Sequence, residues 1–104
     1  MRFQADLAAD YWARGGSGAS GRAQVMDVSR DGMRVAVPHE LPRGERLKFS
    51  LQVPGDNVPI FGTGEVAWAS PAEAVHGAGL RFLQIKPLDL ARMLDYLYTR
   101  WLGA

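Results

Sequence analysis

The chain has 104 residues, of which 47% are hydrophobic, so it can form one compact domain but not two. It contains no cysteine, which excludes disulfides, thiolate catalysis and cysteine-ligated metal sites. The formal net charge is +1, so no overall field attracts the protein to nucleic acid or anionic lipid. Lys48 and Lys86 are the only lysines among the 12 basic side chains, and the others are arginines.

The first residues of the sequence have no apolar core of the kind found in signal peptides, and aspartates already occur at Asp6 and Asp10. No uninterrupted apolar stretch approaches the roughly 18 residues that a membrane-spanning helix requires. We therefore expect a soluble, cytoplasmic protein that does not insert into membranes.

Segments of alternating apolar and polar residues predict β-strands along most of the chain. The first, residues 2–14, is unusually long and places Phe3, Leu7 and Tyr11 on one face. A glycine-rich segment, residues 15–21, follows it and predicts a flexible loop. Further strands are predicted over residues 22–28, 33–37, 45–53, 60–69 and 78–85.

The hydrophobic period changes after the last predicted strand. From Pro87 to Leu102 the apolar residues recur at helical spacing and cover about half of the helical wheel. Pro87 and Asp89 suit the first turn of a helix, and Gly103 suits its end.

The sequence therefore predicts a single domain over residues 1–104. An all-β body, either an antiparallel barrel or a sandwich, spans about residues 2–86. One C-terminal α-helix spans about residues 87–102.

The sequence carries no recognisable catalytic or metal-binding motif. His39 and His76 stand singly in predicted loops, and the acidic residues lack the spacing of paired carboxylates or metal ligands. Phosphate-binding loops, nucleophile elbows and dinucleotide fingerprints are absent from the sequence. We expect a binding protein rather than an enzyme, with no catalytic residue, metal or cofactor.

The segment from Asp27 to Gly32 is the most informative one. Taken alone, it predicts a hairpin turn in which Asp and Ser29 side chains bond to nearby backbone and Gly32 supplies a positive φ. Two further motifs follow it: G-x-V-x-W at Gly64, Val66 and Trp68, and G-x-G-x-x-F at Gly77, Gly79 and Phe82. Together with D-x-S-x-x-G at Asp27, Ser29 and Gly32, these motifs resemble the PilZ domain family over nearly the whole chain.

This resemblance implies a fold and a function. The fold is a six-stranded antiparallel Greek-key β-barrel of the split-barrel type with a C-terminal helix. The function is that of a bacterial, cytoplasmic receptor for the second messenger cyclic di-GMP, which signals to a partner protein. Such signalling controls motility, pili, exopolysaccharide production or biofilm formation.

The resemblance also implies the ligand site, which comprises Arg2, Asp27, Ser29 and Gly32, with Trp68 and Arg30 as additional candidates. A guanidinium group can reach N7 and O6 of guanine together, or bridge phosphates. Asp27 would accept hydrogen bonds from guanine, Ser29 would offer its hydroxyl, and Gly32 would let the backbone approach closely. Trp68 either lies beside the bases or faces into the barrel. Arg30 and Arg34 flank the turn and either supplement the site or remain solvated.

The family's second ligand motif, R-x-x-x-R, is incomplete in this sequence. Arg2 resembles its second arginine, and the first would fall before Met1. An alternative function is therefore a PilZ-type protein-interaction adaptor that does not bind the nucleotide. A third alternative, a barrel that binds single-stranded nucleic acid, requires exposed aromatics between basic residues, whereas Trp12 and Trp68 stand among acids and alanines. We expect cyclic di-GMP and a downstream protein as partners, and no nucleic acid.

Overall fold

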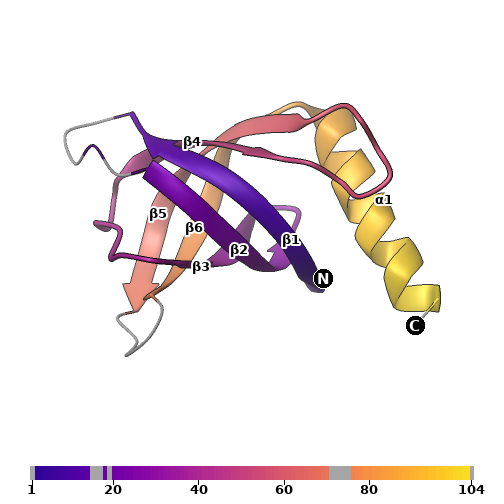
Figure 1. The fold of residues 1–104 in the computed structure, drawn as a ribbon, viewed down its shortest axis with the longest axis horizontal. Helices are drawn as coiled ribbons and strands as arrows, with labels where there is room; N and C mark the ends of the chain where they lie inside the picture. The colour runs from indigo at the N-terminus through magenta and orange to yellow at the C-terminus, as the bar shows by residue number, and fades with distance from the viewer. Residues whose placement is uncertain (1, 15–17, 19, 71–75, 104) are drawn as a thin grey trace.

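Six strands and one helix make up the described part of the chain, which in this computed structural model comprises residues 2–14, 18, 20–70 and 76–103 (Figure 1). The elements are β1 (Arg2–Ala13), β2 (Ser20–Ser29), β3 (Gly32–Val37), β4 (Arg46–Leu51), β5 (Ile60–Ser70), β6 (His76–Ile85) and α1 (Pro87–Gly103). They lie where the alternating pattern and the later helical period predict them, with small differences at their ends.

The strands form a closed barrel in which each strand is antiparallel to both of its neighbours. The order around the barrel is β1-β2-β3-β6-β5-β4. β1 closes the barrel by pairing with β4, from Ala9↔Leu51 to Ala13↔Leu47. Because β4 lies beside β1 while β1, β2 and β3 follow one another, the connection is that of a Greek key. The expected six-stranded antiparallel barrel with a C-terminal helix is confirmed.

The alternation of the strands places their apolar side chains inside the barrel. In β1, Leu7, Ala9 and Tyr11 are buried, and the residues between them are exposed. Tyr11 carries the one polar atom of this group, and its hydroxyl lies 3.3 Å from Nε2 of His39. Burial raises the pKa of the Tyr11 phenol above its usual value, because the anionic form would lose hydration.

The strand predicted over residues 45–53 is shorter in the structure and ends at Leu51. A tight turn follows, in which the Val53 carbonyl accepts a 3.0 Å hydrogen bond from the Asp56 amide. Gly55 adopts a φ of 86° in this turn, a conformation that favours glycine.

β2 and β6 begin earlier than predicted, at Ser20 and His76. The glycines next to these residues suggest a loop, but pairing with a neighbouring strand extends both elements: Gly21 pairs with Tyr11, and Gly77 pairs with Ala36. Most of the predicted glycine-rich loop, residues 15–17 and 19, lies outside the described residues.

α1 packs against the barrel beside β1 (Figure 1). Met93 and Leu97 are its buried residues, and Tyr98 meets Phe3 edge to face with ring centroids 6.0 Å apart. Arg92 connects the helix to the β4–β5 loop by a 2.6 Å ion pair with Asp56. Among the described residues, the helical part does not have the length and apolar character that crossing a bilayer requires.

Candidate ligand-binding site

Residues from β1, β2, β3, β5 and β6 converge on a pocket of about 410 Å³, which we call the motif pocket. Its lining includes five of the six predicted site residues: Arg2, Asp27, Ser29, Gly32 and Trp68. Arg30 is exposed in the turn between β2 and β3 and is outside the set of described residues that line the pocket. The structure therefore brings together motifs that are far apart in the sequence.

Asp27 lines this pocket and is only 5% exposed. Arg2 donates from Nη1 to one of its carboxylate oxygens, and Nε of Arg34 lies 2.9 Å from the other. Two arginines therefore neutralise one buried carboxylate, as a buried charge requires. More than half of each arginine side chain remains exposed, which leaves further N–H donors directed to solvent.

The strand register explains why these three side chains meet. Asp27 pairs with Arg34 between β2 and β3, and Arg2 pairs with Ser29 between β1 and β2. The β2–β3 register shifts between Val25 and Asp27. This irregularity places Asp27 opposite Arg34, and beyond it Val28 is buried as well as Asp27.

Ser29 organises the turn that follows β2. Its hydroxyl oxygen accepts a 3.3 Å hydrogen bond from the Asp31 amide and donates a 3.4 Å hydrogen bond to the Gly32 carbonyl. The Asp31 carbonyl in turn accepts a 2.8 Å hydrogen bond from the Phe82 amide of β6. The expectation that Ser29 bonds to nearby backbone is therefore confirmed, and the turn is fixed to the neighbouring strand.

The prediction of a positive φ at Gly32 is wrong, because the positive φ values of the described residues occur at Gly18, Gly44 and Gly55. Gly32 is required for another reason. A Cβ at this position would overlap the carbonyl oxygen of Leu80 on β6. The absence of a side chain lets β3 approach β6 at the edge of the pocket.

Trp68 lies on the surface rather than inside the barrel, with 44% of its area exposed. The register of β5 and β6 shifts between Val66 and Trp68, and Trp68 then pairs with Gly79. A Cβ at Gly79 would overlap the indole, so the glycine provides the space in which the ring lies. Trp68 therefore does not face into the barrel, and it lines the motif pocket.

Arg34 and Arg81 complete the positive lining of the pocket. Arg34, one of the two arginines that flank the turn, lines the pocket. Arg81 was missed, although it lies inside the G-x-G-x-x-F motif and pairs with Gly32 in the β3–β6 register. Nη2 of Arg81 lies 3.5 Å from Oε1 of Glu65, and 58% of the Arg81 side chain is exposed. Arg81 could have been predicted from its position two residues after Gly79, since residues i and i+2 of a strand lie on the same face.

Comparison with solved structures supports the same fold. The inhibitor of motility MotI/DgrA of Bacillus subtilis matches with a TM-score of 0.78 and 19% identity, over 98% of this chain and 50% of that one. The PilZ domain of YcgR from Escherichia coli, solved with c-di-GMP, matches with a TM-score of 0.71 and 15% identity, over 95% and 87%. The PlzA protein of Borreliella burgdorferi, solved in complex with c-di-GMP, matches with a TM-score of 0.62 and 19% identity, over 93% and 39%.

This chain thus spans about half of the length of the MotI chain and less of the PlzA chain. No curated protein matches the sequence. The sequence model of the PilZ domain family, in contrast, matches residues 9–99. These residues include the turn, both glycine motifs and most of α1. Sequence motifs, barrel topology and the family match agree, and the chain belongs to the PilZ domain family.

Proposed function

We propose that this domain is a cytoplasmic receptor for cyclic di-GMP that signals to a partner protein. PilZ domains are in general binding domains rather than catalysts. The observation that carries the proposal is the position of Asp27 between Arg2 and Arg34, in a pocket bordered by Trp68. YcgR and PlzA, which share the fold, were solved with this nucleotide.

The charges of the motif pocket suit a dinucleotide with two phosphates and two guanines. The described residues that line it include three arginines (Arg2, Arg34 and Arg81) and two aspartates (Asp27 and Asp31). Because the net charge of the whole chain is only +1, the attraction of a phosphate must be local. Exposed guanidinium groups can grip guanine edges or phosphates, and each bidentate contact to guanine contributes about 1–3 kcal/mol of discrimination.

The aromatic and polar groups of the pocket suit the bases. The exposed face of the Trp68 indole offers a surface on which a guanine ring can stack. The Asp27 carboxylate can accept from the N1–H and exocyclic amine of guanine, the donors that distinguish this base. Ser29 and the backbone at Gly32 complete the lining next to the turn.

Isothermal titration of the purified chain with cyclic di-GMP tests this proposal. We expect saturable heat, and a loss of affinity in Arg34→Ala but not in Arg43→Ala, whose side chain is exposed in the β3–β4 loop outside the pocket. Cyclic AMP serves as the ligand control, because it lacks the guanine edge. Absence of heat at ligand concentrations well above micromolar would overturn the proposal.

A second function, an adaptor that does not bind the nucleotide, is favoured by a specific observation. Arg2 and Arg34 are already engaged by Asp27, so a ligand has to compete with that carboxylate for their donors. Co-purification with a protein of the motility, pilus or exopolysaccharide machinery, unchanged by added nucleotide, would favour the adaptor.

A further inference from the structure

A second pocket, of about 750 Å³, lies on the barrel between β1 and the start of α1 and shares no lining residue with the motif pocket. We call it the lysine pocket. We propose that it docks an acidic segment of a partner protein, with an apolar side chain of that segment in the pocket and carboxylates at Lys48 and Lys86. The proposal does not depend on nucleotide binding.

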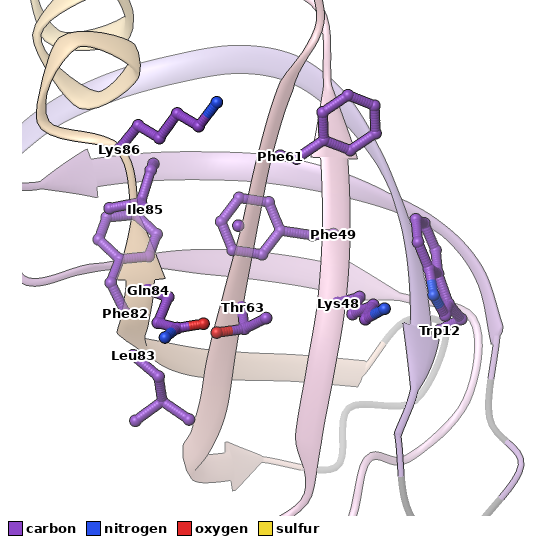
Figure 2. Close-up of a pocket in the computed structure, with 11 residues that line it drawn as sticks. Trp12, Lys48, Phe49, Phe61, Thr63, Phe82, Leu83, Gln84, Ile85 and Lys86 are labelled. Carbon is purple, nitrogen blue, oxygen red and sulfur yellow. The ribbon is translucent and has the colours of Figure 1, made fainter.

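The strand register assembles one side of this pocket. Trp12 pairs with Lys48, Lys48 with Thr63, and Thr63 with Gln84, so these side chains form a row across β1, β4, β5 and β6. Residues opposite one another on neighbouring strands lie on the same face of the sheet. Figure 2 shows the row, with Trp12 at one end and Gln84 near the other.

The pocket has an apolar lining that is continuous with the core. Phe61 and Trp12 are 59% and 39% exposed, which is unusual for side chains of this size. Behind them Phe49 packs against Gly62, where a Cβ would overlap the phenyl ring. Phe49 also packs on Phe82, with ring centroids 5.8 Å apart. The lining is therefore a preformed surface, in which an apolar side chain can be buried without reordering the barrel.

The charges of the pocket are all of one sign. Lys48 and Lys86 are the only two lysines of the chain, and both line this pocket. No carboxylate is among the described residues that line it, and neither lysine forms an ion pair in the described part of the chain. In Figure 2 the two lysines lie on opposite sides of the Phe49 ring. Two separate point charges around an apolar centre are complementary to carboxylates on either side of an apolar side chain.

Two other occupants fit these charges less well. Nucleic acid is recognised by several phosphate contacts, often from arginine, and here there are two lysines and no arginine. A second copy of the chain packed through the same face in a two-fold dimer would bring the lysines of both copies together. An acidic protein segment satisfies both lysines and covers Trp12 and Phe61.

The test uses the isotope-labelled chain, without nucleotide, and a short peptide whose central tryptophan is flanked by glutamates. We expect amide chemical shifts to change at Trp12, Lys48, Phe61 and Lys86, and binding to weaken with salt. Binding should weaken about tenfold or more in the double variant Lys48→Glu, Lys86→Glu, because each lost ion pair is replaced by repulsion. Arg43→Glu is the control, because it also replaces a positive side chain by a glutamate but lies outside the pocket.

A lysine-flanked peptide provides a rescue experiment, since it should bind the double variant more tightly than the unaltered chain. The proposal would be overturned if the glutamate peptide failed to bind, or if it bound the double variant as tightly as the unaltered chain. It would also be overturned if a peptide with glutamines in place of the glutamates bound equally well. Preferential binding of single-stranded DNA, or a dimer in sedimentation that Phe61→Ala dissociates, would also overturn it. Phe61 is exposed, so that variant should retain the fold, which circular dichroism can verify.

Discussion

The indole of Trp68 packs directly on Gly79, its partner across β5 and β6, where a Cβ would overlap the ring at Nε1. The exposed face of Trp68 borders the motif pocket, so this glycine determines where the ring can lie. The G-x-G-x-x-F motif therefore has a steric role: its second glycine makes room for the tryptophan of the preceding strand.

Gly79→Ala should displace the indole from the pocket and weaken cyclic di-GMP binding. Overpacking generally costs about 1–3 kcal/mol, but here the partly exposed ring can swing away, so we expect the change mainly in binding and in tryptophan fluorescence. Gly77→Ala is the matched control, because its Cβ would lie 3.9 Å from both the Ser70 carbonyl oxygen and the Trp68 ring. Equal affinities of the two variants would contradict the steric role of Gly79.

The arginines around the turn should differ in their contribution to binding. Arg2→Ala and Arg34→Ala should each weaken cyclic di-GMP binding by about one to two powers of ten, the equivalent of one lost guanine contact. Arg30→Ala should leave the affinity unchanged, because Arg30 is not among the described residues that line the pocket. Titration calorimetry measures the affinity of the three variants for cyclic di-GMP. A large loss of affinity in Arg30→Ala would contradict the proposed site.

Gly32→Ala should destabilise the barrel. Its Cβ would overlap the Leu80 carbonyl oxygen, a backbone atom that can move only with β6. The expected loss is about 1–3 kcal/mol of unfolding free energy, measured by urea denaturation. In Gly103→Ala, where nothing lies within 4 Å of the new Cβ, stability should stay the same or rise slightly. A Gly32→Ala variant of unchanged stability would show that β3 and β6 can separate freely.

Acid should weaken the contact between α1 and the β4–β5 loop. The hydrogen bond from the Val58 amide and the Arg92 guanidinium lower the pKa of Asp56 below its ordinary value of 3.8. The folded state therefore binds the proton less tightly than the unfolded state. The stabilisation is fully present above the ordinary pKa and is lost as the pH falls through the lowered one.

Asp56→Asn should remove this component of the acid dependence, since the amide cannot titrate. The measurement is the unfolding free energy at neutral pH and below the ordinary pKa, with Glu40→Gln, an exposed loop substitution, as the control. We expect the difference in unfolding free energy between the unaltered chain and Asp56→Asn to become smaller in acid. An equal difference in unfolding free energy at both pH values would refute the role of the Asp56 charge.

The barrel could be predicted from sequence because its strands alternate plainly and its motifs occur in order. In β1 the buried parity of Leu7, Ala9 and Tyr11 can be read from the residues alone. The helix could be predicted from its period and its terminal residues. The strand ends could not, because glycines such as Gly21 and Gly77 owe their extended conformation to the neighbouring strand.

The motif pocket could be predicted in part. Asp27, Ser29 and Gly32 are local in sequence, but the pairing of Asp27 with Arg34 depends on a register shift between β2 and β3. Arg30 is in the turn itself and yet is not among the described residues that line the pocket. The lysine pocket could not be anticipated, because Lys48 and Lys86 are brought together by pairing through β4, β5 and β6.

The pairing of β1 with β4 also limits how this protein can meet other proteins. Where residues 9–13 of β1 pair with β4, the sheet closes on itself, and another chain cannot extend it there by main-chain hydrogen bonds. The same closure protects a strand-rich protein from edge-to-edge aggregation. A partner that meets this closed part of the barrel must therefore recognise side chains of its outer surface, and single substitutions there can alter one partnership while the barrel remains intact.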